Sequence, residues 1–211
     1  MVGYLDTKKV TSLSGVYDTI INGGAEGFQR QFTAFLQEYL ALYCTAHHKE
    51  KVYQALCYML IFAFGKEYDV RMEQDAGHGR SDITAHPFSP QRLLALIFEI
   101  KAVASHSTRN GKRSLKTPER VKKELENAKT EALTQIAERR YRERVPRHVT
   151  KVHEYAFAFC GKFCVAAVRT FGRNAAEDWQ QITADTAVVS ECMVDYTDIG
   201  EEDVEDEDED A

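Results

Sequence analysis

Apolar residues recur at two different spacings along the chain, and the two spacings predict helices and strands. Within residues 25–43 they fall at steps of three and four, which predicts an amphipathic helix. A second helix is expected over residues 49–64, whose second half is almost wholly apolar and is followed by a glycine. A third and longer helix is expected from residue 118 to about residue 141, because an apolar stripe recurs there after a Thr-Pro pair.

Five segments carry patterns that are typical of strands. Residues 68–75 and 81–88 flank a glycine-containing turn and predict a hairpin. Residues 92–103 are apolar on both faces, so this strand is expected at the centre of a sheet. Residues 154–160 and 162–171 predict two further strands that a glycine joins. The element order ααβββαββ predicts an α/β fold, in which helices flank a mixed central β-sheet.

The length of 211 residues suits one domain with extensions. We expect an irregular lead-in over residues 1–24, a domain over residues 25–194 and a disordered acidic tail over residues 195–211. The tail holds eleven of the 33 acidic residues and none of the 27 basic ones, so the rest of the chain carries a net charge of +5. Such a block is most often a solvated tail, and the alternative is that it competes with a polyanion for a basic surface.

The sequence gives no indication of secretion or of a membrane role. Charges occupy the first residues, where a signal peptide has its apolar region, and the apolar run at residues 53–64 is too short to span a bilayer. Five cysteines in such a chain favour reduced, packed thiols. Cys160 and Cys164 lie in strand-like sequence without a second pair, which does not favour zinc. We therefore expect an intracellular protein, cytoplasmic or nuclear, with no membrane partner.

Charged residues interrupt the apolar pattern near the end of the central strand. Alternate residues of a strand share a face, so Glu99 and Lys101 are expected side by side. If residues 81–88 form the neighbouring strand, Asp82 stands beside Glu99, and these like charges are costly unless a cation lies between them. Two carboxylates are what a hard divalent ion such as Mg²⁺ takes from a protein when it also binds a phosphate. Gln135, beside the apolar stripe of the third helix, is expected to face the sheet and to need hydrogen-bond partners there.

Asp82, Glu99 and Lys101 alone form a weak pattern, because a strand that ends in a surface ion pair gives the same letters. Together, the stretches GRSD, FEIK and EALTQIAERRY resemble the PD-(D/E)xK nuclease superfamily, and most closely a branch often found C-terminal to an AAA-ATPase-like domain. The resemblance covers roughly residues 28–171. It departs from the family pattern at Ser81, where a proline commonly precedes the first aspartate.

The resemblance implies a restriction-endonuclease-like fold and a nuclease that depends on Mg²⁺ or Mn²⁺. It also suggests an AAA-ATPase partner or parent chain, although this sequence has no GxxxxGK[ST] motif. It implies metal binding by Asp82, Glu99 and the carbonyl of Ile100. It further implies that Lys101 serves the attacking water or the transition state, and that Gln135 positions groups around the site.

Further matching residues have less certain roles. Glu73 matches an upstream acid whose catalytic role is variable, and Arg80 matches an arginine that touches phosphate or stabilises the fold. Residues 109–123 hold seven basic residues and one acidic residue. This pattern is about equally consistent with contact with backbone phosphates and with a solvated loop and helix face. The candidate nucleic-acid-binding residues are Arg80, Arg109, Lys112, Arg113 and Lys116.

The leading hypothesis is a metal-dependent nuclease that hydrolyses phosphodiester bonds of DNA, or of RNA, with water activated by the metal ion and Lys101. The alternative is a catalytically silent nuclease-like module that binds or regulates, with or without an ATPase partner. The complete set of Asp82, Glu99, Lys101 and Gln135 favours the enzyme. The sequence leaves substrate specificity and oligomeric state open.

Overall fold

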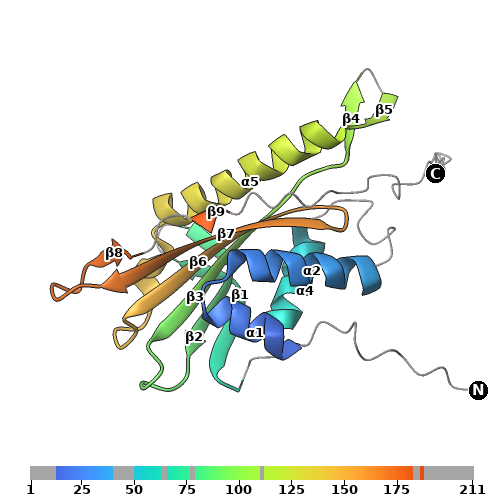
Figure 1. Ribbon diagram of the computed structural model, residues 1–211. Coiled ribbons are helices and arrows are strands. Elements are labelled where there is room, and N and C mark those ends of the chain that lie inside the picture. The colour runs from blue at the N-terminus through green and yellow to red at the C-terminus, as the bar shows by residue number, and fades with distance from the viewer. Residues whose placement is uncertain are drawn as a thin grey trace, which may run out of the picture.

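The computed structural model describes residues 13–39, 50–62, 66–76, 79–109, 112–182 and 186–187. In this part of the chain three helices and three strands come first, followed by a small hairpin, a long helix, a short 3-10 helix and four strands (Figure 1). None of the described helices is long and apolar enough to cross a membrane.

A mixed seven-stranded sheet forms the middle layer of the fold. Only its central pair of strands is parallel among the described pairs, and the others are antiparallel. The expected hairpin of the first two strands is confirmed. In spatial order the strands are β1 (Tyr68–Ala76), β2 (Gly79–Pro87), β3 (Leu94–Ala102), β6 (Lys151–Cys160), β7 (Phe163–Arg173) and β8 (Trp179–Gln181), with β9 (Thr186–Ala187) paired to β7.

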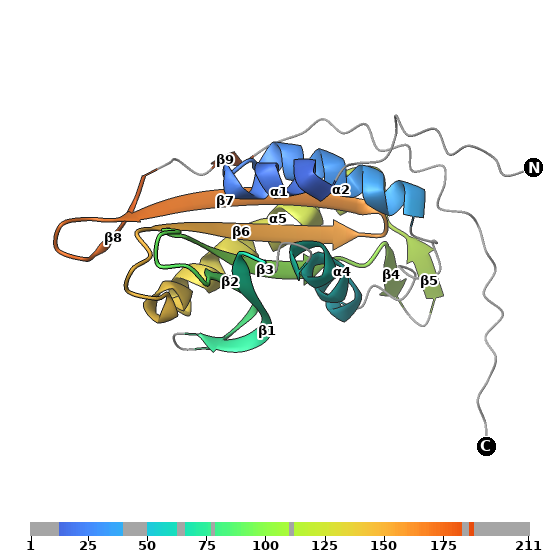
Figure 2. The same cartoon turned by 90° about the horizontal axis from the view of Figure 1, so that it is seen from below.

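Helices cover both faces of this sheet (Figures 1 and 2). The helices α1 (Leu13–Ile21), α2 (Ala25–Tyr39) and α4 (Glu50–Phe62) lie on one face. The longest helix, α5 (Pro118–Glu138), lies on the other. The chain is therefore an α/β fold of three layers, as its sequence predicts.

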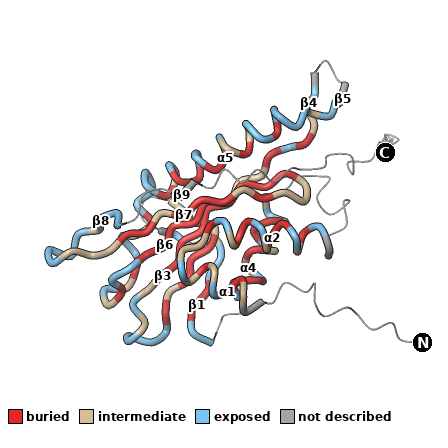
Figure 3. Tube along the Cα trace, in the orientation of Figure 1, coloured by how far each residue is buried: buried red, intermediate tan, exposed pale blue. Residues whose placement is uncertain are grey.

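The side chains of β3 alternate between the two layers, as those of a buried strand should. Leu96 and Ile100 pack in the core cluster that α1, α2 and α4 share, whereas Ala95 and Ile97 pack in the cluster on the α5 side. All four are at most 1 % exposed. Figure 3 shows the buried residues concentrated along β3, β6 and β7. The strand that carries the candidate site is therefore central, as expected.

The parallel pairing of β3 with β6 requires a crossover, and α5 lies within it. Thr117 caps this helix by accepting a hydrogen bond from the backbone N–H of Arg120 at 3.4 Å, and Pro118 opens it. The helix ends at Glu138, three residues earlier than expected, and the 3-10 helix η1 (Tyr141–Arg144) follows. The crossover thus carries the end of α5 over β3.

Two expectations about irregular segments are wrong. Part of the lead-in over residues 1–24 is helical, because α1 packs Val16 and Ile20 into the core. Residues 105–118, whose polar and basic sequence predicts a loop, instead contain an antiparallel hairpin of β4 (His106–Arg109) and β5 (Lys112–Leu115). The acidic tail lies outside the described residues, so its disorder and the proposed domain boundaries stay predictions.

Candidate active site

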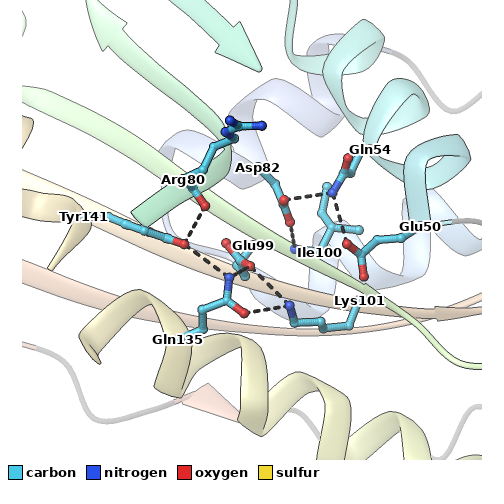
Figure 4. A network of polar contacts seen from close by, with 9 residues as sticks. All are labelled: Glu50, Gln54, Arg80, Asp82, Glu99, Ile100, Lys101, Gln135 and Tyr141. Atoms are coloured by element: carbon cyan, nitrogen blue, oxygen red, sulfur yellow. Dashed lines mark hydrogen bonds and ion pairs between the residues drawn. The ribbon is translucent and has the colours of Figure 1, made fainter. Parts of the chain in front are cut away.

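The candidate site lies where β2 separates from β3. Their ladder pairs Ala85 with Leu96, Thr84 with Ile97 and Ile83 with Phe98, and then stops. One more step of this register would place Asp82 opposite Glu99. The carboxylate of Asp82 instead accepts a hydrogen bond from the backbone N–H of Ile100, at 2.7 Å from Oδ2 (Figure 4). The two strands therefore stop pairing at the level of Asp82 and Glu99.

Glu99 is buried, with 1 % of its surface exposed. Its Oε1 accepts hydrogen bonds from Lys101 Nζ, at 3.3 Å, and from Gln135 Nε2. Its Oε2 is also buried and has no hydrogen-bond partner within the described part of the chain. Burial, and then the neighbouring charge of Asp82, raise the pKa of Glu99 to about 8. The positive charge of Lys101 is therefore too small to offset the burial of Glu99 and the charge of Asp82.

Lys101 and Gln135 both contact Glu99 and also contact each other. Glu99 and Lys101 lie side by side and Gln135 faces the sheet, as expected, but the sequence did not predict the contact between Lys101 and Gln135. Lys101 Nζ donates a hydrogen bond to Gln135 Oε1 at 2.7 Å. Gln135 Nε2 also donates to the hydroxyl of Tyr141 at 3.2 Å, and that hydroxyl donates to the carbonyl oxygen of Arg80 at 2.7 Å. A chain of hydrogen bonds thus connects α5 and η1 to β2 and β3 and fixes the direction of the lysine (Figure 4).

Asp82 contacts the opposite helix layer through Gln54, a residue that the sequence patterns did not single out. Gln54 Nε2 donates to Asp82 Oδ1 at 2.8 Å and lies 3.3 Å from Glu50 Oε1. The pKa of Asp82 is raised to about 6. Burial raises it most, the hydrogen bond from the backbone N–H of Ile100 opposes this, and the charge of Glu50 raises it further. Glu50 also raises the pKa of Glu99. The sequence did contain a signal for Gln54, because a glutamine on the apolar face of an expected helix becomes buried and its amide then needs hydrogen-bond partners.

Glu73 lies on β1 at the position that the β1–β2 register places opposite Asp82. Its carboxylate is ion-paired with Lys51 on α4 and lies 3.9 Å from Arg80 Nη1 on β2. The β1–β2 ladder pairs the residues on either side of Glu73 but omits Glu73 itself, whose backbone is left-handed with φ 52°. These contacts associate Glu73 with two exposed cations, and its catalytic role stays a prediction.

The two carboxylates fit a divalent cation. Within the described residues there is no group of three or more His, Cys, Asp or Glu side chains arranged to hold a metal ion. A site here would therefore combine Asp82 and Glu99 with oxygen atoms from the main chain, water or a substrate, which is how Mg²⁺ is commonly bound. The buried Oε2 of Glu99, which has no hydrogen-bond partner among the described residues, supplies a free donor atom of the right hardness. Coordination by the carbonyl of Ile100 stays a prediction.

The candidate nucleic-acid-binding residues divide into three groups. The side chain of Arg80, two residues before Asp82, is 63 % exposed. Lys116 is mostly buried, and its ammonium donates to the carbonyl of Ala104 at 2.8 Å and to Glu124 at 2.6 Å, which favours a structural role. The side chains of Arg109, Lys112 and Arg113 lie outside the described part of the structure, although their backbones form the β4–β5 hairpin. This hairpin extends beyond the sheet near the start of α5 (Figure 1).

The chain was also compared with known proteins. A family model described as the PD-(D/E)XK nuclease superfamily matches residues 48–168, more than half of the chain. No curated protein and no solved structure matches it. The matched range includes Glu50, Asp82, Glu99, Lys101 and Gln135, and so contains the whole polar network of Figure 4.

Proposed function

Because the chain belongs to the PD-(D/E)XK nuclease superfamily, we propose that it is a divalent-metal-dependent nuclease whose catalytic domain includes α1, since α1 packs into the same core. The substrate is nucleic acid, most readily DNA, and the bond hydrolysed is a phosphodiester. The observation that carries this proposal is the buried Glu99, whose pKa the charge of Asp82 raises and one oxygen of which has no hydrogen-bond partner among the described residues.

Asp82, Glu99 and the carbonyl of Ile100 would hold Mg²⁺ or Mn²⁺. When bound, such an ion polarises the scissile phosphate and neutralises the charge that develops on it. Binding also compensates the two ionised carboxylates, whose pKa values are both raised by burial in its absence. Gln54 would keep Asp82 oriented through the 2.8 Å hydrogen bond to its second oxygen.

Lys101 is the proposed catalytic cation. Hydrogen bonds to Glu99 and Gln135 hold its ammonium beside the carboxylate of Glu99. From this position it can hold the attacking water or donate a hydrogen bond to a phosphate oxygen as negative charge grows there. Gln135 would position Lys101, and Tyr141 would position Gln135 through the 3.2 Å hydrogen bond. These two residues act through Lys101 and not on the substrate directly.

Substrate binding is proposed to use basic residues around the site. Arg80 is exposed two residues before Asp82, and the hairpin of β4 and β5 carries Arg109, Lys112 and Arg113 beyond the end of the sheet. Their charges would neutralise backbone phosphates without reading the base sequence. From the resemblance alone we also propose an AAA-ATPase-like partner or parent chain, which co-purification from cells would test.

A cleavage assay tests the proposed activity. The full chain is incubated with plasmid DNA, single-stranded DNA and single-stranded RNA, with Mg²⁺, with Mn²⁺ or with EDTA. We expect metal-dependent cleavage that Asp82→Ala and Lys101→Ala each reduce by about 100- to 1,000-fold or more. Asp69→Ala and Lys151→Ala remove the same charges from the surface of the same sheet and should retain activity.

The outcomes separate the two hypotheses. Cleavage that survives both site substitutions would contradict the proposed site. Binding of nucleic acid by the wild-type chain without cleavage under any metal condition would favour the binding or regulatory module.

A further inference from the structure

Two cations near Asp82 lie beside one carboxylate, that of Glu73. Lys51 extends from the first turn of α4 and Arg80 from β2, and both approach the side chain of Glu73 on β1. The side chains of Lys51 and Arg80 are 66 % and 63 % exposed, whereas that of Glu73 is 34 % exposed. The partly exposed carboxylate of Glu73 therefore lies between two cations that remain open to solvent, of which Arg80 also lies 4.0 Å from Asp75.

The backbone of Glu73 departs from the strand at this point. The β1–β2 ladder pairs Met72 with Ile83 and Gln74 with Ser81, so its register places Glu73 opposite Asp82, but that pair is missing. Glu73 instead has φ 52°, a left-handed conformation that is unfavourable for a residue other than glycine. Unfavourable backbone conformations concentrate at functional sites, where surrounding contacts maintain them. The described contacts of the Glu73 carboxylate at this point are the ion pairs to Lys51 and Arg80.

The two cations are also close to the proposed catalytic residues. Lys51 follows Glu50 and precedes by one turn Gln54, whose amide binds Asp82. Its charge lowers the pKa of Asp82, against the larger effect of burial. The main chain of Arg80 accepts the hydrogen bond from Tyr141. A phosphate between Lys51 and Arg80 would thus be next to Asp82, on a substrate that continues into the site.

From these contacts we infer that Lys51 and Arg80 form a phosphate-binding clamp, and that Glu73 occupies it in the free protein as an internal anion that the substrate displaces. The inference rests on the proposed function, because it takes nucleic acid as the ligand. Exposed ion pairs are weak, so a phosphodiester, which carries the same single charge as a carboxylate, can replace Glu73 at little cost. Glu73 then sets the affinity for the substrate and takes no part in the chemistry.

Equilibrium binding without cleavage tests the inference. Fluorescence anisotropy of labelled single-stranded and duplex DNA oligonucleotides is measured in EDTA. We expect Lys51→Gln and Arg80→Gln to weaken binding roughly 3- to 10-fold and to reduce the slope of log Kd against log salt by about one unit each. We expect Glu73→Gln to tighten binding by a similar factor.

Two controls separate displacement of Glu73 from a general change of charge. Glu177→Gln removes an exposed carboxylate that also has a left-handed backbone, φ 64°, in the turn before β8 at the far end of the sheet. It should leave Kd unchanged. Adding Glu73→Gln to the Lys51→Gln/Arg80→Gln double variant should give no gain, because the clamp is already absent.

The inference is overturned if Glu73→Gln binds as the wild type does, or if its gain persists without Lys51 and Arg80. It is also overturned if Glu73→Gln abolishes metal-dependent cleavage with binding unchanged, because Glu73 would then belong to the catalytic centre. Each of these results leaves the proposed nuclease activity standing, since cleavage by the wild-type chain is scored separately.

Discussion

Glu99 on β3 and Glu154 on β6 are two buried carboxylates on adjacent parallel strands, near the end of α5. They are 1 % and 0 % exposed. Glu154 is held by two guanidinium groups, with Arg142 Nη1 3.2 Å from one oxygen and Arg169 Nη2 3.5 Å from the other. Glu99 has one ammonium and one amide, both on the same oxygen. Equal burial therefore comes with very different compensation of charge.

The difference separates a structural carboxylate from a candidate catalytic one. Two cations balance Glu154, and Arg169 also donates a hydrogen bond to the carbonyl of Leu133, which joins α5 to the sheet. Glu99 instead faces the second negative charge of Asp82, and its pKa is raised to about 8. A buried acid that the protein leaves under-compensated is suited to receive a cation from outside.

The largest expected effect is the difference in the free energy of unfolding between Glu154→Gln and Glu99→Gln. Glu154→Gln leaves Arg142 and Arg169 partly buried without their acid, so we expect the free energy of unfolding to fall by about 3–5 kcal/mol. Glu99→Gln removes a charge that burial already disfavours, and in metal-free buffer at pH 8 we expect no loss, or a gain. Urea unfolding of both variants measures this. An equal loss in the two would break the comparison.

A smaller effect is expected at Tyr141, which connects the site to β2. Tyr141→Phe removes both hydrogen bonds of the hydroxyl and leaves Gln135 free to turn away from Lys101. We expect cleavage to fall about 10- to 100-fold, as for other residues that orient a site indirectly. Tyr58→Phe is the matched control, because it removes the hydroxyl of a ring that stacks on Phe62 of α4. This variant should cleave normally. Unchanged cleavage by Tyr141→Phe would contradict the positioning role.

The smallest expected effect is the pH dependence of stabilisation by metal. The folded-state pKa values of Asp82 and Glu99, about 6 and about 8, lie above their ordinary values. Their contribution to the stability of the metal-free protein is therefore present below about pH 4 and is lost as the pH rises through 6 and 8. A divalent cation binds the ionised forms, so it should raise Tm by about 2–5 °C more at pH 8.5 than at pH 6.

Differential scanning fluorimetry with and without Mn²⁺ measures this pH dependence. Glu99→Gln, which cannot ionise, should lose most of the difference between the two pH values. A Tm increase that is the same at both pH values in the wild-type chain would show that the metal does not compete with these protons.

The sequence predicted the central part of the fold because β3 and α5 have strong patterns. Apolar residues on both faces of β3 placed it in the centre, and the Thr-Pro pair located the start of α5. The helix α1 was missed because Gly15 and Ser14 interrupt its short apolar pattern. The β4–β5 hairpin was missed although Asn110-Gly111 is a strong turn signal, because polar residues flank it where alternating apolar residues are usual.

The candidate site was predictable where it depends on local geometry. Alternation along one strand aligned Glu99 with Lys101, and helical spacing turned Gln135 toward the sheet. The contact of Gln54 with Asp82 depends instead on how α4 is rotated against β2, which no local pattern determines. The pairing of Glu154 with Arg142 and Arg169 likewise joins three distant segments, so the sequence did not distinguish this carboxylate from Glu99.

Direct titration of Mn²⁺ by calorimetry at pH 8, with the wild-type chain, Asp82→Asn and Glu99→Gln, tests the central claim most directly. If the two carboxylates share one ion, the wild-type chain binds Mn²⁺ and each substitution weakens that binding at least about tenfold. Equal Mn²⁺ affinity in all three folded proteins would contradict the account.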